Sequence, residues 1–289
     1  MNTKYKKMKI NNLIQFSLLL SAFCFLLFPS VFAQDTLYVW KAGDVIYKRA
    51  INQIDTIIFI PPATPPAPCT GTVSDLSGYI YNVVQIGTQC WMKENLKTRR
   101  YNDNVVIDHL PDNVQWSLNT IGAMSYPDND PNNATPLGAY YNWYAVMTGK
   151  LCPTGWHVPT LEEWDALERY LIAAGYNWDG ATSGNKIAKS MAAISPGNRG
   201  TWSETIMDGT PGSIVDYGEI IRNSTGFTVH PAGSREANGI FGVLGLHSYF
   251  WCYSPDIPWL KYMMYMTVDL GGYNTQKGNG LSVRCLRDN

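Results

Sequence analysis

The chain has 289 residues, 45% of them hydrophobic and 16% charged, and its formal net charge is −1. The lack of a basic excess argues against nucleic acid or an anionic membrane as a partner, because both require a concentrated positive surface. The length allows one large domain with a smaller addition, and the abundance of Gly, Tyr and Trp favours a loop-rich fold with an aromatic core.

Residues 1–33 have the features of a cleaved signal peptide. Four lysines precede an apolar run over 16–28, and the small residues Val31 and Ala33 suit a signal peptidase. The run is shorter than the roughly 18 to 20 residues that span a bilayer, and no later segment is apolar for long enough. We therefore expect an exported protein, extracellular, on the outer cell surface or in the periplasm, with no transmembrane segment in the mature chain.

Removal of this leader would change the charge and the cysteine content. Four of the 22 basic residues and none of the 23 acidic ones would be lost, which leaves 18 against 23 and a charge of −5. Attachment through a lipid on Cys24 is an alternative, although Phe23 stands where a lipobox has a small residue. Five cysteines would remain, and export to an oxidising space favours disulfides for at least four of them.

Residues 34–60 predict a small N-terminal β segment. Strands are expected over 36–40 and 45–48 around a short turn, with a third over 54–59. The segment resembles the short N-terminal piece, ending in an Ile-Asp-x-Ile-x-Phe pattern, of many secreted proteins of the Bacteroidetes type. It is too small to bury much core by itself.

The proline-rich residues 61–68 predict a semi-rigid spacer, after which one large domain spans 69–289. Residues 73–92 are rich in aromatic and β-branched side chains between turn signals, which predicts a meander of short strands. Cys69 and Cys90 bracket this meander. A disulfide between them would attach the first strands to the end of the spacer.

The clearest predicted helix covers residues 161–174. Thr160 is a capping residue, and Glu163 completes an S/T-x-x-E capping box. Leucine and tryptophan recur at helical spacing behind it, and Gly175 is expected to end the helix.

Shorter elements are expected after this helix. A second helix is predicted over 184–193, with Ser183 as its cap. Beyond it, aromatic and apolar runs predict strands over 249–253, 260–270 and 281–286. These strands would form the closing part of an irregular antiparallel sheet.

Four strings of the large domain, each containing characteristic aromatic, glycine or cysteine residues, resemble one known family. They lie at residues 85–98, 138–146, 151–160 and 280–288. Together they resemble the Fibrobacter succinogenes major paralogous domain over almost all of 69–289. The resemblance implies an irregular, loop-rich α+β fold related to C-type lectins and formylglycine-generating enzymes, with one or two helices and short antiparallel strands.

The resemblance also implies a disulfide between Cys152 and Cys285. In the related folds such a bridge connects a helix pair to a β-rich loop region. The segments 226–235 and 249–254 resemble two further strings of the family. Cys252 stands where the family usually has serine, so we expect it to be a buried, unpaired thiol.

No group of residues in the sequence predicts catalysis. An oxidase of the formylglycine-generating type needs two thiols close together, and only Cys252 is left over from the expected disulfides. The four histidines lack the spacing of an iron or zinc site. His157 precedes the capped helix and is expected to satisfy local backbone groups. We therefore expect no catalytic residue and no enzyme activity.

Calcium is the metal to consider for a lectin-like fold. Residues 126–133 are dense in oxygen ligands, and Asp128 and Asp130 are the weak candidates for a metal site. The loop lacks the glycine and final glutamate of an EF-hand, and Asp, Asn and Pro are common turn residues. The Glu-Pro-Asn and Trp-Asn-Asp signatures of sugar-binding C-type lectins are absent from the sequence. We expect no cofactor, with calcium as the alternative.

The candidate ligand-binding residues are late aromatic side chains: Trp251, Tyr253, Trp259, Tyr262, Tyr265 and Tyr273. Aromatic rings suit sugars and protein surfaces, and the related folds place variable binding loops in this region. Because alternate residues of a strand point inward, about half of the set should belong to the core. The favoured hypothesis is a secreted or cell-surface, non-catalytic module that binds a glycan or a surface protein. The alternatives are an enzyme of the formylglycine-generating group and a passive surface-coat protein.

Overall fold

The computed structural model describes residues 36–41, 44–50, 68–194, 200–215 and 222–288. The chain divides into two compact units, Met1–Pro65 and Pro66–Asn289. In the first unit, β1 (Thr36–Lys41) and β2 (Asp44–Ala50) pair antiparallel, as the sequence predicts. The expected signal peptide, the third strand and most of the spacer lie outside the described residues.

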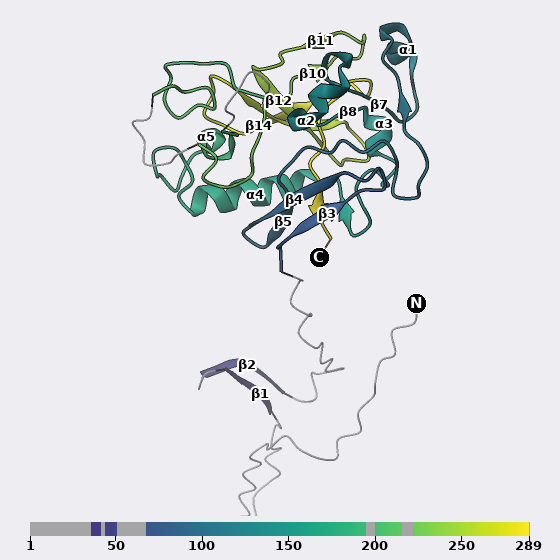
Figure 1. The fold of residues 1–289 in the computed structure, drawn as a ribbon. Helices are drawn as coiled ribbons and strands as arrows, with labels where there is room; N and C mark the ends of the chain where they lie inside the picture. Colours follow the sequence, from purple (N-terminus) through teal and green to yellow (C-terminus); the bar gives the residue numbers. More distant parts are fainter. Residues whose placement is uncertain (1–35, 42–43, 51–67, 195–199, 216–221, 289) are drawn as a thin grey trace, which may run out of the picture. The chain divides into compact units, whose positions relative to one another are not determined.

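The second unit is an irregular α+β body of short elements (Figure 1). Its largest sheet has the strand order β3-β4-β5-β15-β9, with every neighbouring pair antiparallel. These strands are β3 (Thr72–Ser74), β4 (Ile80–Ile86), β5 (Gln89–Met92), β15 (Leu286–Arg287) and β9 (Trp156–His157). The predicted meander corresponds to β3, β4 and β5, and the Cys69–Cys90 disulfide is present beside it. The end of the chain therefore lies inside this sheet, between β5 and β9.

Smaller sheets and helices make up the rest of the second unit. One sheet contains β6 (Asp108–His109), β7 (Ala123–Ser125) and β8 (Tyr140–Tyr141), and a hairpin contains β10 (Ser234–Arg235) and β11 (Phe241–Gly242). A three-stranded antiparallel sheet contains β12 (His247–Cys252), β13 (Trp259–Met264) and β14 (Gly271–Asn274). The shorter helices are α1 (Asn113–Leu118), α2 (Ala134–Leu137), α3 (Trp143–Val146) and α5 (Ala188–Met191), with 3-10 turns η2 (Pro127–Asn129) and η3 (Pro131–Asn133).

The principal helix, α4 (Leu161–Ala173), forms where the sequence predicts it. The Thr160 side chain accepts a hydrogen bond from the Glu163 amide, and the Glu163 carboxylate accepts one from the Thr160 amide. Two amides of the first turn are thereby satisfied. At the other end, Gly175 has a φ of +80°, a conformation that glycine adopts without strain.

Removal of the cap should weaken α4. We expect Thr160→Ala to lower the free energy of unfolding by about 1 kcal/mol, because the Glu163 amide loses its acceptor. Ser183→Ala is the control: Ser183 was predicted to cap the second helix, but α5 begins five residues later, and the change should have almost no effect. Urea unfolding of the two variants measures the difference, and equal losses would contradict the capping role of Thr160.

The second predicted helix is wrong over most of its length. Only α5 is helical, and its start has no side-chain cap. Upstream, the Asn177 amide group donates to the carbonyl oxygens of Ala181 and Gly184 and accepts from the Lys186 amide. Gly184 also has a φ of +73°. The backbone groups that a helix would use are therefore bound to the Asn177 side chain.

The predicted strands over 260–270 and 281–286 are also too long. β13 ends at Met264, after which the Tyr265 amide donates to Leu246 and the chain turns back into β14. Residues 281–285 pass between several elements, and β15 forms only at the end of this segment. For example, Leu281 pairs with Tyr141, whereas the Cys285 carbonyl accepts from Met92.

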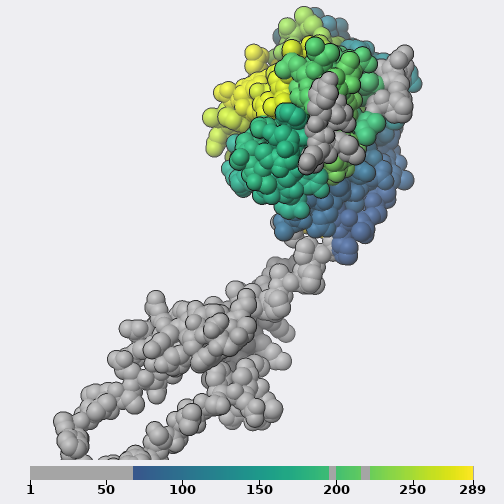
Figure 2. Space-filling model, turned by 90° about the vertical axis from the view of Figure 1, so that its left-hand side faces the viewer, coloured from purple at the N-terminus to yellow at the C-terminus, as the bar shows by residue number. Residues whose placement is uncertain are grey.

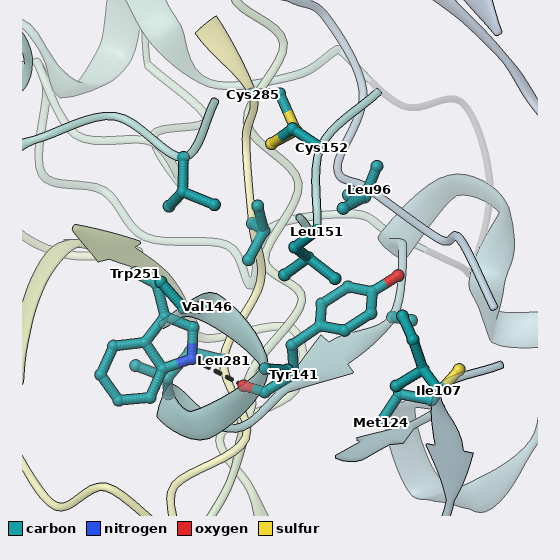
Figure 3. Close-up of a cluster of buried hydrophobic side chains, with 14 of the residues drawn as sticks. Leu96, Ile107, Met124, Tyr141, Val146, Leu151, Cys152, Trp251, Leu281 and Cys285 are labelled. Carbon is teal, nitrogen blue, oxygen red and sulfur yellow. Dashed lines mark hydrogen bonds between the residues drawn. A yellow bond between two sulfur atoms is a disulfide. The ribbon is translucent and has the colours of Figure 1, made fainter. Parts of the chain in front are cut away.

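Two large buried clusters make up most of the core of the described residues, beside a small third one of Leu137, Tyr140 and Ala232. One surrounds Trp251, whose indole Nε1 donates to the Tyr141 carbonyl at 2.6 Å, and it contains the Cys152–Cys285 disulfide (Figure 3). The other connects α4 to two sheets, since the Trp164 ring lies 4.8 Å from that of Trp91 and 5.4 Å from that of Phe250. In Figure 2, α4 in teal and the late strands in yellow-green share one face of the molecule, although they are distant in sequence.

Two buried arginines hold loops together, and neither is in contact with a carboxylate of the described residues. Arg284 is fully buried, donates to Asn95 Oδ1 at 2.7 Å and to the Phe227 carbonyl at 2.5 Å, and lies 4.6 Å from the Phe227 ring. Arg235 donates to the Pro111 carbonyl and lies 4.5 Å from the Trp116 ring. Burial lowers the pKa of Arg284 to about 9 and that of Arg235 to about 10, so both remain charged at neutral pH.

Candidate functional site

The strongest candidate for a binding surface is one face of the β12–β14 sheet. Antiparallel register sets Tyr249 opposite Tyr262, and Tyr262 opposite Gly271, while Tyr273 is opposite Leu260. The ring centroids of Tyr249 and Tyr262 are 6.4 Å apart, and those of Tyr262 and Tyr273 are 5.5 Å apart. We call His247, Tyr249, Tyr262 and Tyr273 the tyrosine face.

Exposure increases across the tyrosine face from strand to strand. Tyr249 is buried, Tyr262 is half-buried, and the side chain of Tyr273 is 42% exposed. Gly271 makes the close packing possible, since a Cβ atom there would lie 2.2 Å from Tyr262 Cζ. The three rings therefore form a continuous row from the buried Tyr249 to the exposed Tyr273.

Polar groups accompany the rings. His247 Nδ1 lies 2.8 Å from the Tyr249 hydroxyl, within hydrogen-bond distance. Burial raises the pKa of Tyr249, and the nearby Tyr273 side chain and Glu236 carboxylate raise it further. The Tyr262 hydroxyl has no hydrogen-bond partner within the described part of the chain.

The opposite face of this sheet is fixed against α4. Lys261 Nζ lies 2.8 Å from Asp165 Oδ1 and 3.3 Å from Glu168 Oε2, and Phe250 packs against Trp164. Because alternate residues of a strand point to opposite faces, these contacts leave the tyrosine face directed away from α4.

The structure separates the six aromatic candidates. Trp251 is fully buried and bound to Tyr141, so its assignment to a ligand surface is wrong. Trp259 and Tyr265 pack against the α4 cluster, and Tyr253 packs against the cluster around Trp251. Only Tyr262 and Tyr273 belong to the tyrosine face. Strand alternation places Trp259 on the side of the sheet that faces α4, whereas Trp251 lies on the same side as Tyr249 and is buried because the cluster around it covers that part of the sheet.

Sequence reasoning missed three members or neighbours of this site. His247 and Tyr249 share a face because they are two residues apart in β12, but the predicted strand over 249–253 begins two residues too late to include His247. Glu236 follows β10, and nothing in its local sequence connects it with β12 or β14. Its proximity depends on the tertiary arrangement.

The acidic loop over 126–133 forms 3-10 turns. The Asp130 carboxylate accepts from the backbone and side-chain nitrogens of Asn132, at 2.9 and 2.8 Å, and so caps η3. Asp128 has a φ of +51° inside η2. Across the described ranges, no three His, Cys, Asp or Glu side chains are placed to hold a metal ion.

A concavity, separate from the tyrosine face, lies beside the edge strand β3. It has a volume of about 230 Å³ and extends from β3 to residues 151–154, with Arg100 and Asn102 in its lining. The Asn102 side chain donates to the Cys152 carbonyl, and Arg100 donates to the Asn104 carbonyl. These polar groups already serve the surrounding loops.

Comparison with known proteins places the fold in a family. The model of the Fibrobacter succinogenes major domain matches residues 84–287. The chain belongs to this family. No curated protein and no solved structure matches the chain. Within the described residues, no helix combines the length and apolar character that crossing a membrane requires.

Two of the strings that resemble the Fibrobacter succinogenes major domain contain residues that stabilise the fold. The string over 151–160 contains Cys152 and the α4 cap, and the string over 280–288 contains Arg284 and Cys285. Tyr262 and Tyr273 lie outside every string. The family pattern therefore covers the scaffold and the buried Tyr249, but not the two more exposed rings of the tyrosine face.

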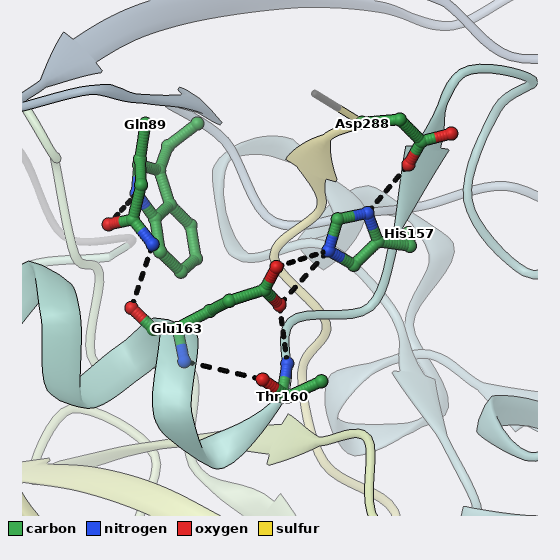
Figure 4. Close-up of polar contacts among 6 residues, drawn as sticks. Gln89, His157, Thr160, Glu163 and Asp288 are labelled. Carbon is green, nitrogen blue, oxygen red and sulfur yellow. Dashed lines mark hydrogen bonds and ion pairs between the residues drawn. The ribbon is translucent and has the colours of Figure 1, made fainter. Parts of the chain in front are cut away.

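His157 joins three segments of the Fibrobacter succinogenes major domain (Figure 4). Its Nδ1 lies 2.6 Å from Asp288 Oδ1, and its Nε2 lies 3.0 Å from both oxygens of Glu163. The expectation that His157 serves backbone groups is wrong, because two carboxylates from α4 and the chain end reach it instead. Hydrogen bonding to Glu163 raises the pKa of His157, and Asp288 raises it further.

This arrangement predicts a pH dependence of stability. The folded-state pKa of His157 is above its ordinary 6.5, so its contribution is complete below that pH and is lost as pH rises through the folded pKa. Burial would raise the pKa of Glu163, but bonds from His157 and the Thr160 amide lower it below 4.5 overall. Its contribution is complete above pH 4.5 and is lost in acid. The pair therefore stabilises most between pH 4.5 and 6.5.

We expect the wild-type protein to be stabilised relative to His157→Gln at about pH 5.5, by under about 1 kcal/mol because the pair is partly exposed. The difference should shrink by about pH 8.5. Comparison with the variant is needed because burial lowers the pKa of the other three histidines, which act in the opposite direction. A difference in urea midpoint that stays constant with pH would contradict the ion pair.

Cys252 is a free and buried cysteine. Burial raises the pKa of its thiol to about 12, so the thiolate that a nucleophile requires does not form near neutral pH. Its location on the side of β12 that faces α4 also separates it from the tyrosine face.

Proposed function

We propose that the chain is a non-catalytic binding module, exported to the cell surface or beyond, that recognises a glycan or a surface protein through the tyrosine face. The supporting observation is the sequence of three tyrosine rings across β12, β13 and β14, which ends at the exposed ring of Tyr273. Tyrosine offers apolar area and a hydroxyl at small entropic cost, since its side chain has two rotatable angles.

A C-type-lectin-like scaffold is part of this proposal. It is supported by the irregular α+β body and by the Cys152–Cys285 disulfide, which connects the segment before α4 to the residue that precedes the last strand, β15. Such a scaffold would hold the β12–β14 sheet rigidly while its exposed side chains vary. Lys261 of β13 anchors the sheet to α4 through its ion pair with Asp165. Trp251 of β12 anchors it to the core through its hydrogen bond to the Tyr141 carbonyl.

The absence of catalysis is also proposed. An enzyme of the formylglycine-generating type would use reactive thiols, whereas Cys252 is buried and burial raises the pKa of its thiol to about 12. His157 could act as a base in isolation, but both of its nitrogens are occupied by carboxylates. Both observations support a binding role.

The proposal predicts the effect of removing rings from the tyrosine face. We expect Tyr262→Ala combined with Tyr273→Ala to weaken ligand binding by about tenfold or more, because two aromatic contacts are lost. Tyr170→Ala is the matched control, since Tyr170 is 46% exposed on α4, outside the face. An array of glycans and surface proteins, probed with the full chain and both variants, measures this. Binding that survives the double substitution, or no binding at all, would exclude the proposed site.

A further inference from the structure

The free edge of the largest sheet and the concavity beside it form a second site. We infer that β3 and this β3 concavity bind an extended acidic peptide segment of a partner protein. The peptide backbone pairs with Thr72 and Ser74, one peptide side chain enters the concavity, and a peptide carboxylate contacts Arg100. The site is separate from the tyrosine face, so the inference goes beyond the function proposed above and does not depend on it.

The outer side of β3 has unpaired backbone groups. β3 is the first strand in the order of its sheet, and Thr72 is opposite Asn82 of β4. The Asn82 amide donates to Glu94 and its carbonyl accepts from the Lys93 amide, so this pair shares no hydrogen bond. Alternation along an antiparallel strand then directs the N–H and C=O groups of Thr72 and Ser74 outward. Within the described residues these outward groups have no hydrogen-bond partner.

β3 also lacks the features that protect an edge strand from pairing. Lysine, proline, a bulge or a covering loop usually blocks the edge of a natural sheet. The sequence of β3 is Thr-Val-Ser, without a charge or a proline, and Thr72 and Ser74 are exposed. At the other edge of the sheet, β9 is two residues long, and Glu163 and Asp288 bind the ring of its His157. The edge available to an added strand is therefore β3.

The β3 concavity has the size of one side chain. Its volume of about 230 Å³ is below the roughly 300 to 1,000 Å³ of pockets that enclose small molecules. Its apolar lining residues are Val73, Leu76, Leu151 and Pro153, and Leu76 is 55% exposed. Because alternate side chains of an added strand point to the same side, one of them can enter the concavity while its neighbours stay outside. These dimensions favour a peptide over a cofactor or an oligosaccharide.

Arg100 gives the concavity its preference for an acidic peptide. The Arg100 Nη1 donates to a backbone carbonyl of its own loop, whereas its Nε and Nη2 have no partner among the described residues. The Asp75 carboxylate also lines the concavity, but it already accepts from two backbone amides and from the Tyr81 hydroxyl at 2.6 Å. The guanidinium is thus the charged group with donors left for a ligand, and a carboxylate is its complement.

The probes are short synthetic peptides of alternating threonine and valine. One glutamate and one leucine are scanned through all positions, with matched glutamine and lysine versions, and binding to the full chain is measured by fluorescence polarisation. At least one glutamate peptide should bind about tenfold more tightly than its glutamine match. N-methylation of alternate amides should abolish binding for one set of amides and leave it unchanged for the other, because only alternate backbone groups of an added strand face β3.

Variants of the chain test each contact. Ser74→Pro removes an outward N–H and no hydrogen bond to β4, so it should weaken peptide binding by about tenfold or more with little change in the urea midpoint. Arg100→Gln should remove the preference for glutamate. Arg99→Gln is the matched control, since Arg99 is exposed and does not line the concavity, and it should keep the preference. The double variant Tyr262→Ala and Tyr273→Ala should bind the peptide as the wild-type protein does.

Four outcomes overturn the inference. The first is that no peptide binds, and the second is that glutamate and glutamine peptides bind equally well. The third is binding that N-methylation of either set of amides leaves unchanged. The fourth is self-association of the free chain that Ser74→Pro abolishes, which would make a second copy the occupant of β3. All four leave the proposed function unaffected, because the tyrosine face is tested by its own variants.

Discussion

Replacing Cys152 and Cys285 by alanine should lower the free energy of unfolding by roughly 4 to 5 kcal/mol. The bridge connects residues 133 positions apart, and closing so long a loop removes much of the entropy of the unfolded chain. Both sulfurs lie in the core cluster around Trp251, so their loss also removes packing. Urea unfolding of the double variant against the wild-type protein measures the change.

The matched control is the second disulfide. Cys69 and Cys90 are 21 positions apart, so removing that bridge should cost roughly 3 kcal/mol, less than the long-range one. Cys252→Ala, which removes a thiol without a bridge, separates the effect of the covalent link from the loss of a sulfur atom. If the short bridge proves more important than the long one, the role given to Cys152–Cys285 is wrong.

Arg284→Lys should cost about 3 kcal/mol although the formal charge is kept. Lysine cannot place planar donors on Asn95 Oδ1 and on the Phe227 and Met92 carbonyls together, so buried acceptors are left unpaired. The guanidinium also lies between the rings of Phe227 and Phe250, where its flat face packs.

Arg169→Lys is the control for this prediction. Arg169 is exposed on α4, and the same chemical change there should alter the free energy of unfolding by less than about 0.5 kcal/mol. Both variants can be compared by urea unfolding at neutral pH. Equal, small effects at the two positions would show that the buried hydrogen bonds of Arg284 contribute little.

The sequence predicts correctly those elements whose stabilising contacts are made by residues close together in the chain. The capping box of α4 involves Thr160 and Glu163, three residues apart, and the helix begins and ends within one residue of the prediction. The meander over 73–92 follows from alternation and turns, and its disulfide closes a short loop. The Cys152–Cys285 pairing came from family resemblance, since spacing alone does not choose a partner.

Features that depend on distant groups were not predictable. The predicted helix over 184–193 is mostly absent because the Asn177 side chain binds backbone groups in and before its first part, and only α5 remains helical. His157 is within hydrogen-bond distance of Asp288, 131 residues away, and no local sequence pattern predicts that contact. The same is true of the tyrosine face. Strand register brings Tyr262 and Tyr273 together, and tertiary packing against Tyr141 buries Trp251 although it lies on the same side of the sheet.

Chemical-shift mapping of the full chain with a ligand found on the array tests the binding site most directly. The largest shifts on titration should occur at Tyr262 and Tyr273, with smaller ones at His247 and Tyr249, and residues lining the β3 concavity, such as Arg100, should stay unchanged. Shifts concentrated at that concavity, or along α4, would contradict the assignment of the tyrosine face as the binding surface.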